Sequence, residues 1–360
     1  MSSSSQQLTF LYMPDISGFT QFVNETEIEH STHIIQELLE IIISANQLNM
    51  ELMEIEGDAV FFYRFGNTPS LKGIIEQSKT IFKKFHEHLL KYEHRRVCQC
   101  GACRTANNLT LKFIVHCGTV SSYYIRDRFK LIGKDIIILH RLLKNKVPSN
   151  EYLLLTESLF GLFNNEYLEK HQLSAVEETE EFDTALINYK YIQTKQWLNE
   201  IGHPDETGNE KVPNMVPAVS INKEIKAPSD IVFNYIANLS KRAEWMKGVK
   251  NIEIVSGEKI NQAGTIHKCI VENNNISLFK TNYFEHTDED YSITETDSNN
   301  ESFAQQFTVE KISPDSCMVN LQFLVKNRLI NKLMFFLFMK KRITKNFVMS
   351  LVTLRTRFNK

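Results

Sequence analysis

The spacing of apolar residues in the first half of the chain predicts a mixed α/β domain. Residues 8–13 form a short apolar run with aromatic side chains, which is typical of a buried strand. Apolar residues recur at three- to four-residue spacing over residues 27–46, and residues 71–92 are likewise amphipathic, which predicts two helices. The remaining pattern predicts a helix at 136–143, strands at 47–56, 59–63, 109–115, 119–125 and 152–155, and a last strand pair around 177–191, with 109–115 and 119–125 as a hairpin. This order indicates an α+β sandwich with helices on one side of a mainly antiparallel sheet.

A change in composition predicts a second domain. Residues 199–216 hold glycines and prolines among charged residues, which is typical of a linker. Residues 228–230 then predict the start of a helix, several strands follow, and a long helix is expected at about residues 330–357. We therefore expect one domain over residues 8–198 and a second over residues 217–360.

The composition fits two ordinary globular domains without a polyanionic partner. The chain has 360 residues, of which 42% are hydrophobic and 23% charged, and its formal net charge is −2. Binding a nucleic acid over a whole surface requires an excess of lysine and arginine, so we expect no nucleic-acid partner. Residues 1–7 lack the basic and apolar regions of a secretory signal, and the apolar run at residues 333–339 is far shorter than the roughly 20 residues that cross a bilayer. The sequence thus predicts a cytoplasmic protein with no transmembrane segment.

Two aspartates are the first candidates for chemistry. Asp15 ends the first predicted strand, and Asp58 lies at a tight turn between two later strands. Their carboxylates would meet at neighbouring strand ends, where Mg²⁺ or Mn²⁺ could bridge them to phosphate oxygens. The residues that open the following helix would offer backbone amides to a triphosphate: Ser17, Gly18, Phe19 and Thr20. An aspartate at a strand end can also be a helix cap or a turn residue, so both interpretations stay open.

Four motifs in this half, in their order and spacing, resemble the class III adenylate and guanylate cyclase homology domain. They are residues 15–20 (DISGFT), residues 54–59 (EIEGDA), residues 114–118 (IVHCG), and Gly133 followed eight residues later by Arg141. The resemblance implies a ferredoxin-like α/β sandwich that binds a nucleoside triphosphate and a divalent metal. It also implies a homodimer, because members of this family form their sites at the interface between two subunits.

Matched position by position, the resemblance carries over part of the catalytic set. Asp15 and Asp58 match the two metal-binding aspartates, and Arg141 matches the arginine that stabilises charge on the transferring phosphoryl group. Ile137 stands where active members hold an asparagine that orients the ribose, and the acidic residues 177–183 contain no match for the lysine that binds the phosphates. These two differences argue against an efficient cyclase.

The position that selects the base also departs from the family pattern. Glu54 matches the glutamate with which guanylate cyclases read the guanine edge, but its partner position is Lys130. The two side chains would either pair with each other and partly close the purine pocket, or bind another base. The sequence therefore does not distinguish ATP from GTP.

A cysteine cluster has no counterpart in the cyclase resemblance. Cys98, Cys100 and Cys103 follow one another closely and could supply three thiolates to Zn²⁺, which takes four tetrahedral ligands. The candidates for the fourth ligand are His94, His116 and Cys117. We expect a structural zinc, with free buried or redox-active thiols as the alternative. An insert of this kind is similar to that of an uncharacterised group of bacterial cyclase-like proteins.

The second domain resembles the START-like superfamily, which includes polyketide cyclases and lipid-transfer proteins. The resemblance rests on residues 225–233 (IKAPSDIVF), on the surroundings of Trp245, and on the strands and long helix that follow. It implies a helix-grip fold, in which a curved sheet holds the last helix and leaves an apolar cavity for a small apolar ligand. Phe233 and Trp245 are the candidates for its lining. His267 and His286 stand alone, so we expect them to be structural or exposed and see no catalytic acid or base.

The last predicted helix carries many basic residues beside apolar ones. Such a helix can lie on an anionic membrane surface, or its apolar face can pack within its own domain. We favour packing within the domain.

Three functions follow from these patterns. The favoured one is a signalling or sensory protein, in which a divergent, weakly active or inactive cyclase-like module binds nucleotide and metal and is coupled to a domain that binds a small apolar ligand. The second is an active class III cyclase that makes a cyclic nucleotide from ATP or GTP. The third is a carrier of apolar ligands whose first domain is vestigial.

Overall fold

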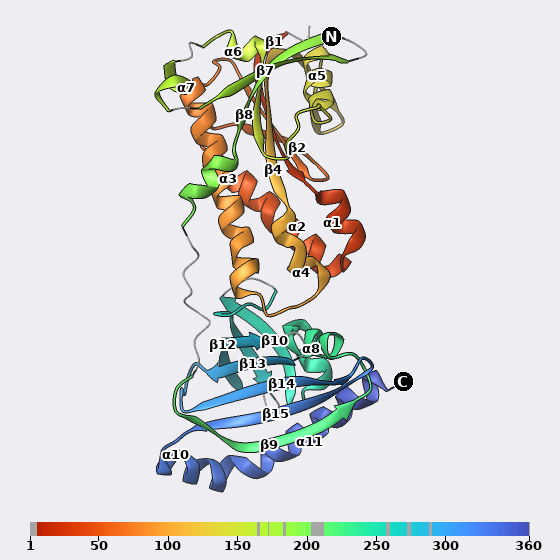
Figure 1. Cartoon of the computed structure of the whole chain (residues 1–360), viewed down its shortest axis with the longest axis vertical. Coiled ribbons are helices and arrows are strands. Elements are labelled where there is room, and N and C mark those ends of the chain that lie inside the picture. The colour runs from red at the N-terminus through yellow and green to blue at the C-terminus, as the bar shows by residue number, and fades with distance from the viewer. Residues whose placement is uncertain are drawn as a thin grey trace. The chain divides into compact units, whose positions relative to one another are not determined.

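The described residues of the computed structural model fall into two units (Figure 1). Unit 1 spans residues 1–90 and 105–203, and unit 2 spans residues 91–104 and 204–360. The structure describes residues 6–163, 166–171, 173–182, 185–202, 212–256, 260–271, 275–287 and 290–359. Half of the expected linker at 199–216, residues 203–211, lies outside the described residues, and the expected boundaries at residues 198 and 217 stay predictions.

Unit 1 is built on an eight-stranded sheet. Its strands are β1 Gln7–Ser17, β2 Glu51–Glu56, β3 Ala59–Phe65, β4 Thr110–Ile125, β5 Arg128–Ile132, β6 Tyr152–Thr156, β7 Ala175–Phe182 and β8 Ala185–Gln193. They follow the order β2-β3-β1-β4-β6-β8-β7, and β5 pairs with β4. Every pair is antiparallel except β4 with β6. The expected α+β class with a mainly antiparallel sheet is therefore confirmed.

Helices cover both faces of this sheet, whereas the sequence predicted them on one face. The helices are α1 Phe19–Glu25, α2 Ile28–Ser44, α3 Leu71–Arg95, α5 Lys134–Leu142, α6 Glu157–Phe160 and α7 Glu166–Lys170. Leu11 of β1 belongs to a core cluster with Leu139 of α5. The next residue, Tyr12, points the other way, and its hydroxyl hydrogen-bonds to Ser78 of α3 at 3.0 Å. Because β1 is buried on both faces, its apolar run is continuous instead of alternating.

The expected hairpin at residues 109–125 is a single long strand. The first part of β4 pairs with β1, and its last part pairs with β5, a strand that the pattern did not predict. The chain reverses after β4 near Arg126, whose backbone φ is 56°. Gly118, which lies between the two expected strands, is part of β4.

Unit 2 is built on a seven-stranded antiparallel sheet. Its strands are β9 Met215–Ile225, β10 Val249–Ser256, β11 Ile266–Val271, β12 Ile276–His286, β13 Asp290–Asp297, β14 Phe303–Ser313 and β15 Ser316–Lys326. They follow the order β10-β11-β12-β13-β14-β15-β9, so the first strand pairs with the last. The helices are α4 Gly101–Thr105, whose last residue belongs to unit 1, α8 Ser229–Ala237, α9 Arg242–Trp245, α10 Leu329–Met334, a π-helical segment Phe335–Met339, and α11 Lys340–Phe358. A START-like helix-grip fold stays a prediction for this unit.

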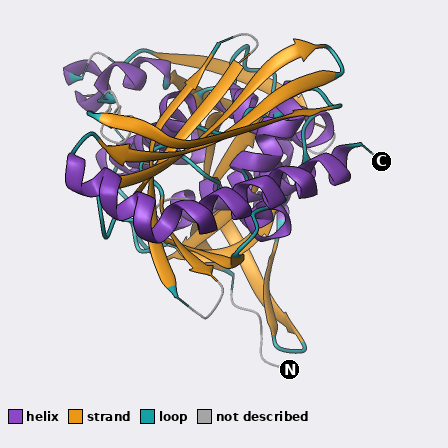
Figure 2. Cartoon of the chain, turned by 90° about the horizontal axis from the view of Figure 1, so that it is seen from below, coloured by secondary structure: helices purple, strands orange, loops and turns teal. Residues whose placement is uncertain are grey.

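The expected long helix lies along the sheet of unit 2 (Figure 2), but only part of it packs there. Phe347, Leu351 and Leu354 of α11 are buried in the core of the unit. Most apolar side chains of α10 and of the π-helical segment are exposed, so the favoured packing within the domain is wrong for this part. Among the described residues, no helix has the length and apolar character that crossing a bilayer requires.

Candidate functional site

The two candidate metal-binding aspartates lie side by side in unit 1. Asp15 stands opposite Ala59 in the pairing of β1 with β3, and the N–H of Ile16 donates to the carbonyl oxygen of Asp58 at 3.1 Å. Burial and repulsion from the Asp15 carboxylate raise the pKa of Asp58 to about 6. The strand register and this backbone hydrogen bond make the two residues neighbours. The structure therefore brings together the pair that the sequence singled out.

A lysine that the sequence analysis did not consider is bound to this pair. Lys112 stands opposite Asp15 in the pairing of β1 with β4, and its Nζ lies 2.9 Å from Oδ2 of Asp15. The same Nζ donates a hydrogen bond to the carbonyl oxygen of Leu143 at 2.9 Å. The ammonium also lowers the pKa of Asp58, although less than burial and Asp15 raise it. One protein cation thus already neutralises part of the charge that a divalent ion would bind.

The candidate base-reading residues are bonded to each other. Lys130 of β5 donates a hydrogen bond to Glu54 of β2, and about a third of each side chain is exposed. Next to them, Glu56 forms an ion pair with His140 of α5 at 3.2 Å. Burial raises the pKa of Glu56, with His140 opposing this effect and Glu54 adding to it. Of the alternatives left open, the structure adopts the pairing of Glu54 with Lys130.

The remaining nucleotide candidates lie on exposed or partly exposed elements of unit 1. Gly18 has a left-handed φ of 89° and precedes α1, so the chain turns at the expected position between Ser17 and Phe19. Arg141 and Ile137 are both exposed on α5, one turn apart and therefore on the same face.

A buried hydrogen-bond network involves the motif that contains His116 and Gly118. Nε2 of His116 lies 3.1 Å from Oδ1 of Asp135, and its Nδ1 lies 2.7 Å from Oγ1 of Thr156. The N–H of Thr119 donates to Oδ2 of Asp135 at 2.8 Å. Burial would raise the pKa of Asp135, but the bonds from His116 and Thr119 outweigh it and hold that pKa below its usual value. Asp135 lies in the first turn of α5, so this network fixes the helix to β4. Within unit 1, both ring nitrogens of His116 thus have hydrogen-bond partners.

The three candidate cysteines converge within unit 2, in and beside α4. The sulfur atoms of Cys98, Cys100 and Cys103 lie within 4.8 Å of one another, and all three residues are buried. Asn234 of α8 fixes the loop, because its Oδ1 accepts from the N–H of Gln99 at 2.7 Å. Hydrogen bonds with Cys100 and Cys98, together with burial, raise the pKa of the Cys103 thiol. Three buried, convergent sulfurs fit three positions of a tetrahedral zinc site.

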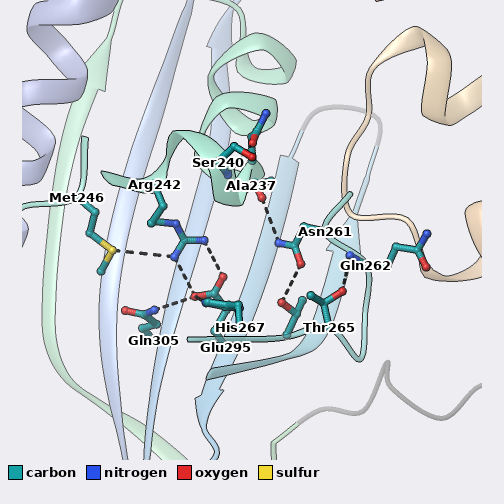
Figure 3. A network of polar contacts seen from close by, with 12 residues as sticks. Ala237, Ser240, Arg242, Met246, Asn261, Gln262, Thr265, His267, Glu295 and Gln305 are labelled. Carbon is teal, nitrogen blue, oxygen red and sulfur yellow. Dashed lines mark hydrogen bonds and ion pairs between the residues drawn. The ribbon is translucent and has the colours of Figure 1, made fainter. Parts of the chain in front are cut away.

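Unit 2 also encloses a charged group that the sequence did not reveal (Figure 3). Arg242 of α9 donates two hydrogen bonds to Glu295 of β13, at 2.9 and 2.7 Å, and both residues are fully buried. Gln305 of β14 donates to the same carboxylate at 2.7 Å. Burial opposes the charge of Glu295, but Arg242 and His267 lower its pKa to about 2. His267 is buried 3.8 Å from Glu295, and burial lowers its pKa to about 4, so it is neutral at pH 7.

A cavity of about 290 Å³ lies beside this group, between the sheet and α11. Its apolar lining includes Met246, Val249, Phe279, Phe303, Phe323, Met339, Ile343 and Phe347. Gln305 provides a polar contact that connects the cavity to Glu295. Phe233 and Trp245 are not among the described lining residues, contrary to expectation. Phe233 stacks on Tyr291 at 4.9 Å, and Trp245 packs edge-on against Phe307 at 5.9 Å, so both fill the core.

Comparison with known proteins gives the following matches. A family model described as "Protein of unknown function (DUF2652)" matches residues 35–152. An uncharacterized protein, Rv2561/Rv2562 of Mycobacterium tuberculosis, is 34% identical over 121 residues, which is 34% of this chain. The chain covers 56% of the length of that relative.

The structural neighbours include adenylyl and guanylyl cyclase domains, which match about half of the chain. The adenylyl cyclase CyaB from P. aeruginosa is 14% identical, with a TM-score of 0.37, and the match covers 52% of this chain and 94% of the neighbour. The guanylyl cyclase Cya2 is 10% identical, with a TM-score of 0.37, and the match covers 52% and 93%.

Proposed function

We propose that unit 1 is a divergent nucleotidyl-cyclase-like module that binds a divalent cation and a nucleoside triphosphate with little or no turnover. Unit 2 binds a small ligand with an apolar body, and the protein acts in signalling or sensing. The observation that carries the proposal is the meeting of Asp15 and Asp58, together with the ion pair between Lys112 of β4 and Asp15 of β1.

The lysine supports weak activity for an electrostatic reason. Two ionised aspartates carry a charge of −2, but the ammonium at 2.9 Å from Asp15 reduces the local charge to −1. A divalent cation must either displace the ammonium or bind in its field. Ile137 is a second reason to expect weak activity, since its apolar side chain can form no hydrogen bond to a ribose hydroxyl. An active cyclase that makes a cyclic nucleotide from ATP or GTP is the second candidate, favoured by retention of Asp15, Asp58 and Arg141.

Replacing Lys112 by alanine is expected to tighten Mn²⁺ binding by about tenfold, because the ammonium no longer competes for Asp15. Titration calorimetry of the full chain at pH 8 measures this effect. That pH lies above the Asp58 pKa of about 6, so the Asp58 carboxylate is ionised. Lys84→Ala, which removes an exposed lysine of α3, is the matched control and should leave the affinity unchanged. Equal affinities for wild type and Lys112→Ala would show that the lysine does not occupy the cation site.

The same proteins test for turnover when they are incubated with ATP or GTP and Mn²⁺. We expect little cyclic product from the wild type. Abundant product that disappears in Asp58→Ala would replace the proposed module by a working cyclase.

The apolar ligand of unit 2 is proposed from the cavity beside α11. Aromatic and aliphatic side chains form about half of its wall, and polar groups of Lys247, Asp297, Gln305, Arg342 and Asn346 also border it. This arrangement suits an amphipathic small molecule that places its polar end near Gln305.

We further propose that the cysteine segment binds a structural zinc ion. The residues that would hold it are Cys98, Cys100 and Cys103, as thiolates, and the metal would fix the loop that precedes α4. Protein purified without chelators should contain about one zinc per chain by mass spectrometry of the metal. Cys103→Ser should lose most of this zinc, whereas Cys317→Ala, which alters a buried cysteine of β15, should keep it. Equal zinc in the wild type and Cys103→Ser, or none in either, would exclude the site.

A further inference from the structure

The surface of α10 and of the following π-helical segment is strongly apolar. Seven large side chains in this region are each more than half exposed: Leu329, Ile330, Leu333, Met334, Phe336, Leu337 and Phe338. Isolated apolar residues are common on protein surfaces, but a contiguous group of this size marks an interaction site. We call this group the apolar patch.

The patch belongs to an ordered part of unit 2 and not to a loosely attached end. Phe335, in the middle of the segment, is buried and stacks on Phe323 of β15, with ring centroids 5.1 Å apart. Phe347 and Leu351 anchor the helix that follows. These contacts are made by the inward face of the segment. The exposed side chains therefore lie outside the core of the unit.

Basic residues flank the apolar patch along the chain, and this stretch of the sequence contains no acidic residue. The cations of residues 328–345 are all exposed: Arg328, Lys332, Lys340, Lys341, Arg342 and Lys345. Residues 316–360 contain no aspartate and no glutamate. Nζ of Lys340 lies 4.9 Å from the ring centroid of Phe336, so charge and apolar surface are directly adjacent.

We propose that the apolar patch and its cations dock on an anionic lipid surface. The phenylalanine and leucine side chains enter the boundary between headgroups and acyl chains, and the lysines and arginines contact lipid phosphates. The segment lies in the plane of the interface.

Charge favours a lipid surface over a second copy of the chain. In a twofold contact between two patches, the cations of one copy would face those of the other, because residues 316–360 offer no acidic partner. An anionic membrane provides both an apolar interior and negative charge at its surface.

Docking would also place the ligand cavity of unit 2 close to the lipid. Met339, Arg342 and Ile343 border that cavity, and they directly follow the patch along the chain. This proximity would give the proposed apolar ligand a route between the membrane and the cavity.

The test is co-sedimentation of the full chain with vesicles. We expect binding to vesicles of phosphatidylcholine with phosphatidylserine, and at least about tenfold weaker binding to phosphatidylcholine alone. Phe336→Ser/Phe338→Ser and Lys340→Gln/Lys341→Gln should each weaken binding to the anionic vesicles by about tenfold or more. The matched control Leu186→Ser/Ile231→Ser removes two exposed apolar side chains elsewhere and should bind as the wild type does.

Three results would overturn the inference. The first is equal binding to neutral and anionic vesicles, and the second is unchanged binding of the phenylalanine variant. The third is absence of vesicle binding together with a dimer, seen by light scattering, that Phe336→Ser/Phe338→Ser dissociates, which would make the patch an interface between copies. Circular dichroism of each variant verifies that the chain stays folded.

Discussion

Arg242→Met is expected to lower the free energy of unfolding of unit 2 by about 3–5 kcal/mol, because it leaves the Glu295 carboxylate buried without its countercharge. Arg242 and Glu295 are both fully buried and share two hydrogen bonds. His267 compensates little, since burial, the largest cause of its low pKa, is the same in the variant. Gln305 would still donate one hydrogen bond, which compensates only a small part of the lost charge interaction.

Urea unfolding followed by tryptophan fluorescence measures this loss. The chain has two tryptophans, Trp197 in unit 1 and Trp245 in unit 2, and Trp245 lies 5.6 Å from the Arg242 guanidinium. In a Trp197→Phe background, the signal therefore reports on unit 2 alone.

Two further variants show whether the uncompensated charge is the cause. Arg242→Met/Glu295→Leu removes both charges and should recover most of the lost stability. Arg357→Met removes a surface partner of Glu244, 3.4 Å away, and should change stability by no more than about 1 kcal/mol. If Arg242→Met unfolds at the same urea concentration as the Arg357 variant, then the buried pair does not contribute as argued.

The sequence could predict elements whose signal is local. The stripe of Ile34, Leu38 and Ile42 is visible as a helical period, and these residues are buried in α2 as the period requires. Asp15 and Asp58 could also be found, because each lies in a short motif of the cyclase resemblance. Their meeting in unit 1 follows from the antiparallel pairing of β1 with β3.

Other parts depend on pairings between distant segments, which a single sequence does not contain. Lys112 lies in an ordinary strand pattern, and only its register against Asp15 reveals the ion pair. Arg242 and Glu295 are 53 positions apart, and each alone resembles a surface residue. The apolar run after residue 329 can be seen in the sequence. Whether its side chains face the core or the solvent depends on how α11 packs.

Gly118→Ala is expected to lower the free energy of unfolding of unit 1 by about 2–3 kcal/mol. A Cβ atom at this position would lie 2.2 Å from Cγ of Asp135, far inside van der Waals contact. Asp135 cannot move away freely, because His116 and the N–H of Thr119 hold its two carboxylate oxygens. Relief therefore requires a shift of α5, which carries Arg141, or the loss of buried hydrogen bonds.

The matched control for this substitution is Gly73→Ala in α3. The added Cβ there has its closest neighbours at 3.4 and 3.5 Å, and alanine is favoured over glycine inside a helix by roughly 0.5–1 kcal/mol. The same chemical change should thus destabilise unit 1 at position 118 and leave it unchanged or stabilise it at position 73. Fluorescence of Trp197 in a Trp245→Phe background follows unit 1 during urea unfolding. A Gly118→Ala protein as stable as Gly73→Ala would mean that β4 and α5 can separate without cost, and the network would then not fix the helix.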